Sequence, residues 1–215
     1  MKKGIFILLV FAILFNNLIS AQEKMTKFII HTEIGDIKGL LYNDTPQHRD
    51  NFIKLVKEGW YNGSYFHRVI SNFMIQAGHN SNGKVDPGYT IPAEILPNHF
   101  HKKGALSAAR MGDNVNPKKE SSGCQFYIVQ GQVYNDATLN NMEQRGGITL
   151  SEEQRTAYIN VGGTPHLDGA YTVFGQIADG FDVIDKIASL RTDPADRPLA
   201  DIKMTIEIIE WNSDF

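Results

Sequence analysis

The chain has 215 residues, of which 42% are hydrophobic and 21% are charged, and its formal net charge at pH 7 is −3. This length and composition are typical of one globular domain, and the mild acidity argues against a nucleic-acid-binding protein. The single cysteine, Cys124, excludes an intramolecular disulfide and a zinc site built from several cysteines.

The amino terminus has the pattern of a secretory signal peptide. Lys2 and Lys3 precede an unbroken apolar run at residues 5–15, and the small residues Ser20 and Ala21 follow it. A positively charged start, an apolar core of this length and small residues at its end predict cleavage, which we place after Ala21.

We therefore expect residues 1–21 to be removed and the mature chain, residues 22–215, to work in the periplasm or outside the cell. The alternative is an uncleaved membrane anchor, which needs about 20 apolar residues. Asn16 and Asn17 interrupt the run before that length, so we expect no stable membrane anchor.

Short strands account for most of the predicted mature chain. Residues 27–42 should form a hairpin with its turn at Gly35 and Asp36. Residues 202–208 alternate between apolar and polar side chains, which predicts a strand with one face in the core. Further short apolar runs, expected to be strands, lie at 65–70, 73–77, 105–109, 125–129 and 171–177. Short strands separated by turns predict an all-β barrel or sandwich.

Two helices are predicted beside these strands. The first begins at Thr45, which can accept backbone N–H bonds as the N-cap, and Pro46 follows at a position where no donor is needed. Gly59 should end this helix, and a second helix should span residues 180–190. The apolar stripe of the first helix is formed by Phe52, Leu55 and Val56.

Residues 131–166 depart from the regular spacing of strands. This segment is polar and rich in glycine, and Ser151 with Gln154 predicts a capping box at the start of a helix. Gly162 and Gly163 should end that helix. We interpret the segment as an insertion between two strands of one domain rather than as a second domain.

General catalytic and metal-binding patterns are weak. His99 and His101 are close in sequence, but no third metal ligand has a recognisable spacing. Cys124 could act as a nucleophile only beside a histidine, for which His67 and His166 are the candidates, and no helix start precedes it to lower its pKa. We expect Cys124 to be a structural thiol, and we expect neither a metal nor a cofactor.

The strongest signal is a set of motifs in a fixed order. The chain reads FHRVI at 66–70, FMIQAG at 73–78, GALSAAR at 104–110, SGCQFYI at 122–128 and LDGAYTVFG at 167–175. At these motifs the chain resembles the cyclophilin-type peptidyl-prolyl isomerases, and the resemblance runs from about Lys27 to Trp211.

This resemblance implies an eight-stranded antiparallel β-barrel closed by two α-helices, with a peptide groove on its outer face. By position, Arg68 matches the catalytic arginine of the family, and Gln76 matches a residue that holds the substrate backbone. The positions that match substrate-binding residues are Phe73, Met74, Ala109, Gln125, Tyr127, His166, Leu167 and Tyr171. Of these, Phe73, Met74, Tyr127 and Leu167 match the walls of the proline pocket. His166 and Tyr171 stand where many eukaryotic members carry Trp and His, and Cys124 stands where Ser is commoner.

The chemistry of prolyl isomerisation agrees with these residues. Rotation about a peptide bond costs about 18–20 kcal/mol because resonance gives the C–N bond partial double-bond character. No bond forms or breaks, so the reaction needs no nucleophile, metal or cofactor. In the twisted state the proline nitrogen regains its lone pair, and a fixed guanidinium can donate to it more strongly than in the planar state.

We therefore expect a monomeric prolyl cis–trans isomerase that acts on proline-containing peptides and unfolded exported proteins and has no nucleic-acid partner. One alternative is a non-catalytic proline-peptide binding module or holdase chaperone, which would have no need of Arg68. Another is a cysteine hydrolase, which would need a Cys124 thiol that reacts at neutral pH. Because the insertion ends at the predicted groove, we expect it to affect the choice of protein substrate rather than the chemical step.

Overall fold

The computed structural model describes residues 24–146 and 148–209, and the predicted signal peptide lies outside these residues. The helices are α2 (Pro46–Lys57), α3 (Asp136–Gln144), α4 (Glu152–Asn160), α5 (Phe181–Ala188) and the short 3-10 helix η1 (Pro165–Leu167). The strands are β1 (Thr26–Thr32), β2 (Gly35–Leu41), β3 (Ser64–Tyr65), β4 (Arg68–Ile70), β5 (Met74–Ala77), β6 (Thr90–Ile91), β7 (Ala105–Ala108), β8 (Ser121–Ser122), β9 (Phe126–Val129), β10 (Val173–Asp179) and β11 (Lys203–Ile209).

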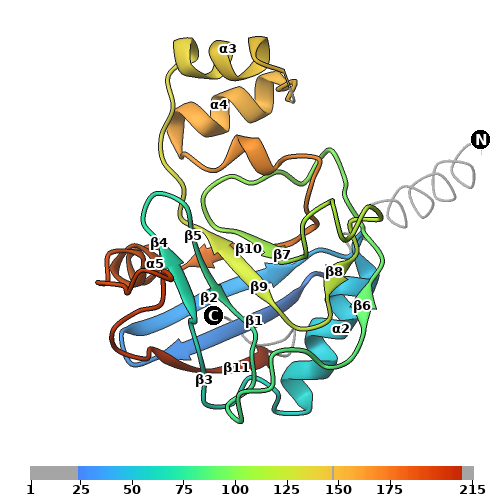
Figure 1. The fold of residues 1–215 in the computed structure, drawn as a ribbon, viewed down its shortest axis with the longest axis vertical. Coiled ribbons are helices and arrows are strands. Elements are labelled where there is room, and N and C mark those ends of the chain that lie inside the picture. The colour runs from blue at the N-terminus through green and yellow to red at the C-terminus, as the bar shows by residue number, and fades with distance from the viewer. Residues whose placement is uncertain (1–23, 147, 210–215) are drawn as a thin grey trace, which may run out of the picture.

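The main sheet confirms the expected antiparallel barrel. Its strand order is β3-β11-β1-β2-β10-β7-β9-β5-β4, and it curls round on itself (Figure 1). Only Phe66 and His67 separate β3 from β4, so these two form one interrupted strand that pairs with β11 at one end and with β5 at the other. Counted in this way, the barrel has the predicted eight strands. The small second sheet of β6 and β8 was not expected from the sequence.

The first hairpin forms as predicted, but its turn lies two residues earlier. Thr32 pairs with Gly35, which leaves Glu33 and Ile34 as the loop. The N–H groups of Ile34 and Gly35 donate to the Thr32 hydroxyl at 3.1 and 3.2 Å, and this hydroxyl donates to the Gly35 carbonyl at 2.7 Å. A threonine hydroxyl that bonds the following backbone stabilises a turn directly after it. Gly35 and Asp36 therefore begin β2 instead of forming the turn.

Helices α2 and α5 lie at opposite ends of the barrel (Figure 1). The predicted stripe of α2, Phe52, Leu55 and Val56, is buried in the main core, and α5 contributes Val183, Ile184 and Ile187. Gly59 follows the C-cap of α2 with a left-handed φ of 70°, which confirms its predicted role at the end of that helix.

The amino terminus of α2 is capped by a side chain that the sequence did not indicate. Thr45 occupies the N-cap position, but its side chain makes no capping bond. Instead, the carboxylate of Glu94 accepts the N–H of Gln47 at 3.1 Å and that of His48 at 3.0 Å. A carboxylate is favoured at this position because the first N–H groups of a helix are unpaired and carry positive partial charge.

Residues 131–166 connect β9 to β10 through two helices that stand apart from the barrel (Figure 1). The predicted capping box of Ser151 and Gln154 starts α4. Helix α3 was missed, although Asn135 caps it by accepting the N–H of Thr138 at 2.8 Å. The helices share an apolar cluster with the loop before β7, made of Phe100, Leu139, Leu150 and Tyr158.

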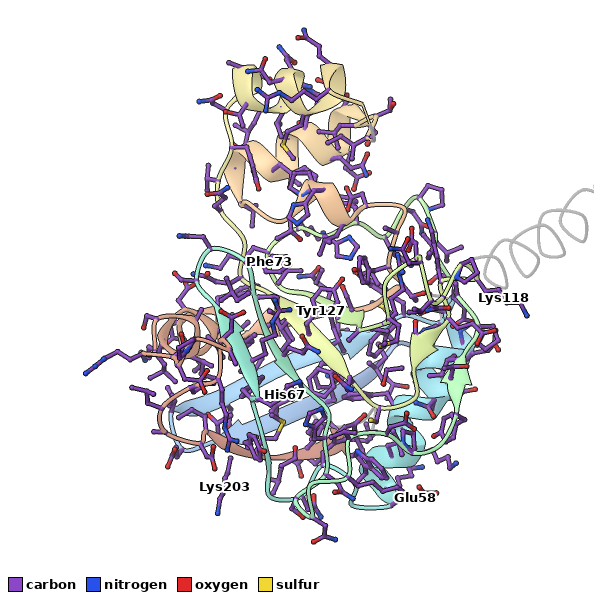
Figure 2. The ribbon with its side chains drawn as sticks, in the orientation of Figure 1. Glu58, His67, Phe73, Lys118, Tyr127 and Lys203 are labelled. Atoms are coloured by element: carbon purple, nitrogen blue, oxygen red, sulfur yellow. The ribbon has the colours of Figure 1, made fainter. Side chains whose placement is uncertain are left out.

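Strand alternation divides the apolar side chains of the barrel into two sets. On β9, Phe126 and Ile128 belong to the main core, whereas Tyr127 and Val129 belong to a second cluster on the other face. Figure 2 shows Tyr127 and Phe73 over the sheet and below the insertion helices. Phe66, Phe126 and Phe174 lie in the main core. The second cluster therefore makes the outer face of the barrel apolar where the groove was expected.

Candidate active site

The strand register aligns three polar or aromatic side chains across the outer face of the barrel. Arg68 on β4 pairs with Gln76 on β5, and Gln76 pairs with Tyr127 on β9. Directly opposed residues on antiparallel strands have Cβ atoms about 4.5–5.5 Å apart. The sheet therefore holds a guanidinium, an amide and a phenol side by side.

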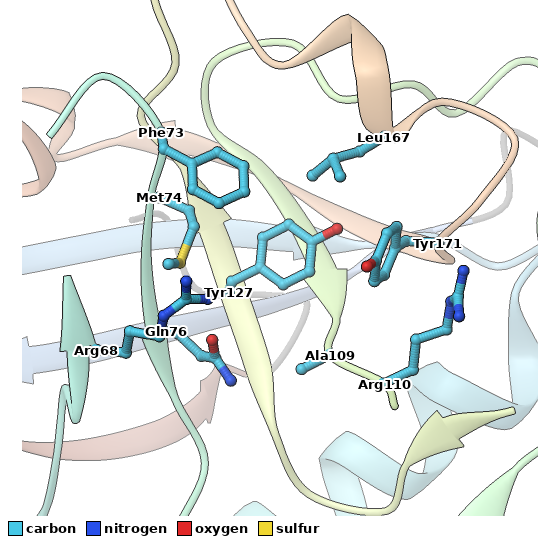
Figure 3. Close-up of a pocket in the computed structure, with 9 residues that line it drawn as sticks. All are labelled: Arg68, Phe73, Met74, Gln76, Ala109, Arg110, Tyr127, Leu167 and Tyr171. Carbon is cyan, nitrogen blue, oxygen red and sulfur yellow. The ribbon is translucent and has the colours of Figure 1, made fainter. Parts of the chain in front are cut away.

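A pocket of about 180 Å³ lies over this row (Figure 3). This volume is below the roughly 300–1,000 Å³ of sites for drug-sized ligands, so the pocket suits a single side chain of a larger ligand. Its walls are Arg68, Phe73, Met74, Gln76, Ala109, Arg110, Tyr127, Leu167 and Tyr171. All of these residues except Arg110 are candidates predicted from the sequence.

Apolar and polar walls occupy different sides of the pocket. Figure 3 shows Phe73 and Met74 on one side, Leu167 on another and the ring of Tyr127 between them. Arg68 and Gln76 lie together at one edge. The arrangement can hold an apolar ring while hydrogen-bond donors reach the backbone beside it.

Asp196 orients the guanidinium of Arg68. The Nε of Arg68 donates to Oδ2 of Asp196 at 3.3 Å, and the two side chains are 42% and 40% exposed. The carbonyl of Asp196 also accepts the N–H of Val69 at 2.8 Å, which ties its loop to β4. Because this ion pair engages Nε, the terminal nitrogens of Arg68 face Gln76 and the pocket (Figure 3).

Gln76 is held by Gln125, which lies beside the pocket rather than in its wall. The Nε2 of Gln76 donates to Oε1 of Gln125 at 3.1 Å, and Nε2 of Gln125 donates to the carbonyl of Val85 at 3.3 Å. Gln125 lines an adjoining hollow of about 500 Å³ that shares Gln76 and Ala109 with the pocket. The structure thus places Gln125 where an extended ligand would leave the pocket.

His166 lies at the rim of the pocket. Its side chain is exposed, and its ring centroid is 5.6 Å from that of Phe73. It is not among the residues that line the pocket. His166 therefore contacts a wall residue from outside instead of forming a wall itself.

Arg110 is the wall residue that the sequence did not indicate. Its guanidinium carbon lies 4.4 Å from the ring centroid of Tyr171, and its Nε donates to the carbonyl of Ala170 at 2.8 Å. The side chain is 4% exposed and forms an ion pair with Asp113 at 2.6 Å. A guanidinium over an aromatic face is attractive, so Arg110 supports Tyr171 as a wall. Arg110 lies within the GALSAAR motif, but only the path of the chain after β7 brings it to the pocket.

Cys124 has the properties of a structural thiol. It is 4% exposed, and burial raises the pKa of its thiol to about 11. At neutral pH the side chain is therefore protonated, whereas a cysteine nucleophile has to be a thiolate. These properties argue against the cysteine hydrolase alternative.

A serine, a histidine and a glutamate elsewhere have the spacing of a catalytic triad. The Ser121 hydroxyl lies 2.9 Å from Nε2 of His48, whose Nδ1 lies 2.6 Å from the carboxylate of Glu94. However, Ser121 is only 1% exposed and cannot reach a substrate. Burial lowers the pKa of His48, and Glu94 caps α2, so this arrangement links α2 to the loop of Glu94 and to strand β8 and is structural.

His99 and His101 do not form a metal pair. Nε2 of His99 lies 2.7 Å from Asp44, whereas Nδ1 of His101 lies 2.9 Å from Asp168. Among residues 24–146 and 148–209, no group of three or more His, Cys, Asp or Glu side chains could hold a metal ion. The same residues contain no helix with the length and hydropathy needed to cross a membrane.

Comparison with protein families agrees with this geometry. The family model described as cyclophilin type peptidyl-prolyl cis-trans isomerase/CLD matches residues 27–207. A Staphylococcus saprophyticus protein named as a peptidyl-prolyl cis-trans isomerase is 38% identical over 190 residues, which are 86% of this chain and 92% of that protein. A Staphylococcus aureus protein with the same name is 37% identical over 186 residues, 84% of this chain and 90% of its own.

Solved structures show the same fold. A cyclophilin type peptidyl-prolyl cis-trans isomerase of Cryptosporidium parvum matches with a TM-score of 0.65 and 25% identity, over 86% of this chain and 98% of that one. A second structure of that Cryptosporidium protein, solved in the presence of the dipeptide Ala-Pro, matches with a TM-score of 0.64 and 24% identity, over 86% of this chain and 99% of that one.

Proposed function

The chain belongs to the cyclophilin-type peptidyl-prolyl cis-trans isomerase family, and we propose that it accelerates the isomerisation of X–Pro bonds by non-covalent stabilisation of the twisted peptide. The observation that carries this mechanism is the row of Arg68, Gln76 and Tyr127 beside the single-side-chain pocket. The substrates are proline-containing peptides and unfolded polypeptides.

The first step in the proposed mechanism is to hold the proline ring. The apolar walls bind the ring and fix its side of the peptide bond, so that the acyl side rotates. A pocket that holds only one ring leaves the rest of the substrate backbone outside, next to the polar edge. The apolar walls are Phe73, Met74, Tyr127 and Leu167.

Arg68 supplies the transition-state contact. When the peptide twists, resonance is lost and the proline nitrogen becomes a hydrogen-bond acceptor, whereas in the planar state it accepts poorly. A donor that is already in place costs little reorganisation at that moment. The bond from Nε of Arg68 to Asp196 provides this preorganisation.

Gln76 holds the substrate backbone beside the proline. Its amide nitrogen is engaged by Gln125, which leaves the amide oxygen of Gln76 to accept a backbone N–H of the substrate. The hollow next to Gln76 and Ala109 gives the chain before or after the proline a path across the barrel. Gln76 therefore contributes to substrate orientation, and Arg68 contributes the electrostatic stabilisation.

The proposed substrates in the cell are exported proteins during folding. The support is the signal-peptide pattern of Lys2, Lys3, the apolar run 5–15 and Ala21. Intact-mass measurement on protein from the native cell should give a chain that starts at Gln22. A full-length mass would overturn the proposed export.

A cis-to-trans exchange assay on an X–Pro tetrapeptide tests the enzymatic function. The purified protein should accelerate exchange in proportion to its concentration, and a peptide with alanine in place of proline should not compete. A protein that binds the tetrapeptide without accelerating exchange would be the non-catalytic binding module, and the proposed mechanism would be wrong.

A further inference from the structure

A continuous series of hydrogen bonds connects helix α4 of the insertion to the pocket. The hydroxyl of Tyr158 donates to Oδ2 of Asp168 at 2.6 Å, and Nδ1 of His101 lies 2.9 Å from Oδ1 of the same carboxylate. At the other side of the ring, Nε2 of His101 lies 3.0 Å from the hydroxyl of Tyr127. Tyr158 and His101 are 0% exposed and Tyr127 is 5% exposed, whereas the side chain of Asp168 between them is 11% exposed.

The donors and acceptors in this series follow from the carboxylate of Asp168. An ionised carboxylate only accepts hydrogen bonds, so both Tyr158 and Nδ1 of His101 must donate to it. The backbone N–H of His101 donates to Oδ1 at 2.9 Å, and Nε2 of Gln154 donates to Oδ2 at 3.1 Å. In the tautomer with its only proton on Nδ1, the His101 ring accepts the hydroxyl proton of Tyr127 at Nε2. Burial raises the pKa of Tyr127 well above its usual value, which keeps this hydroxyl a donor.

The hydrogen bond to His101 holds the hydroxyl end of the Tyr127 ring, in addition to the contacts that the ring makes with its aromatic neighbours. The ring already packs edge-on against Tyr171, with centroids 6.0 Å apart, and lies parallel to the His101 ring at 6.1 Å. These contacts hold its faces and edges, and the hydroxyl bond to His101 holds its tip. A phenol held at its tip and its faces keeps one orientation in the pocket.

The insertion itself is seated firmly on the His101 segment. The N–H of Thr164 donates to the carbonyl of His101 at 2.8 Å, and Tyr158 packs edge-on against Phe100 with centroids 5.7 Å apart. Any Cβ at Gly163 would collide with the carbonyl of His101 and the ring of Tyr158, so glycine permits this close approach. The insertion and the segment around His101 therefore form a closely packed interface.

We infer that Tyr158 of the insertion is a positioning residue for the active site, which sets the orientation of the Tyr127 wall through Asp168 and His101. This inference rests on the proposed isomerase function. It differs from the expectation from sequence that the insertion affects the choice of protein substrate rather than the chemical step. Tyr158 lies 10 residues before Asp168 and outside the groove motifs, and only the folded chain connects it to Tyr127.

A double-mutant cycle on the full chain tests the inference. Tyr158→Phe removes only the hydroxyl at one end of the series, and Tyr127→Phe removes the hydroxyl at the other end. Each single variant should lower kcat/KM on the X–Pro tetrapeptide by about 3- to 10-fold, the effect of one lost hydrogen bond. In the Tyr127→Phe background, Tyr158→Phe should change kcat/KM by less than about 1.5-fold, because the path is already broken.

Tyr134→Phe is the matched control. Tyr134 lies in the same insertion, its ring centroid is 6.3 Å from that of Tyr158, and its hydroxyl accepts Nε2 of Gln132 at 3.3 Å outside the series. This variant should keep wild-type kcat/KM. A general loosening of the insertion would affect the Tyr134 and Tyr158 variants alike and would add to the effect of Tyr127→Phe, which would overturn the inference.

The outcomes separate this inference from the proposed function. Wild-type protein without activity on the tetrapeptide contradicts the function, whereas active wild type with an equally active Tyr158→Phe variant contradicts only the inference. If Tyr158→Phe fails to fold, nitrogen NMR of His101 in the wild-type protein decides. The inference requires the tautomer with its proton on Nδ1, and a ring protonated only on Nε2 would overturn it.

Discussion

Arg68→Ala should remove catalysis while leaving the fold intact. The side chain of Arg68 is 42% exposed, its partner Asp196 is 40% exposed, and an ion pair of this kind contributes about 0.2–1 kcal/mol to stability. The backbone pairing of Arg68 with Gln76 does not depend on the side chain. For a protein of this size, 1 kcal/mol corresponds to about 2–4 °C in Tm, so the variant should melt within about 4 °C of wild type.

The expected loss in rate is much larger than the loss in stability. Removal of one preorganised donor to a developing charge typically lowers the rate by about 10²–10³, or some 2.7–4 kcal/mol of transition-state stabilisation. The contact of Arg68 with the planar substrate is weaker, because the amide nitrogen has no free lone pair. Peptide affinity, which depends on Phe73, Met74 and Leu167, should therefore fall much less than turnover.

Arg68→Lys distinguishes charge from geometry. Lysine keeps the positive charge but lacks the planar group that donates to Asp196 through Nε and to the substrate through its terminal nitrogens. If preorganisation by Asp196 matters, the lysine variant should recover only a small part of the activity lost in Arg68→Ala. Recovery to near the wild-type rate would show that charge alone is sufficient.

Exchange kinetics and ground-state binding should be measured on the same tetrapeptide. kcat/KM reports the stabilisation of the twisted state, a binding titration reports the affinity for the planar substrate, and circular dichroism verifies the fold. A folded Arg68→Ala protein with wild-type turnover would refute the role of Arg68 and the electrostatic mechanism together. An equal loss in affinity and turnover would assign Arg68 to substrate binding instead.

Three further predictions concern residues around the site and the core. Asp196→Asn should lower kcat by about 3- to 10-fold with little change in Tm, because the neutral amide orients the Arg68 guanidinium less strongly; unchanged kcat would exclude a positioning role for Asp196. Burial alone would raise the pKa of Glu94, but its bonds from His48 and from two backbone N–H groups lower it below its usual 4.5. The Glu94 contribution to stability is therefore present above that pH and lost as the pH falls, so Glu94→Gln should cost about 0.5–2 kcal/mol of unfolding free energy at pH 7. Urea unfolding should also show a shallower decline for this variant between pH 5 and 3, and an identical decline would disprove the role of Glu94. Burial, with the nearby His79 and Arg68, lowers the pKa of His67 from 6.5 to about 4. Below pH 6.5 the unfolded chain therefore binds a proton at His67 that the folded chain does not bind until about pH 4. The free energy of unfolding should fall from pH 7 towards pH 4 less steeply in His67→Gln than in wild type. Parallel curves for the two proteins would contradict this prediction.

Local patterns determined much of this fold, because they depend on residues a few positions apart. Alternation along β9 separates Phe126, which is buried in the core, from Tyr127, which faces the pocket. The capping box of Ser151 and Gln154 involves residues three positions apart. The motifs around Arg68 and Gln76 predict these two candidate site residues from sequence alone, because a motif match depends only on order along the chain.

The tertiary structure decided which distant side chains complete these local elements. Glu94 caps α2 from 46 residues along the chain, and Asp196 orients Arg68 from 128 residues away. Tyr158 reaches the pocket only through two intervening side chains. The sequence near such partners gives no sign of their role, because an aspartate, glutamate or tyrosine with no local motif is indistinguishable from an ordinary surface residue. Closure of the barrel brings β4 beside the loop before β11, and packing of the insertion onto the His101 segment gives Tyr158 its buried partners.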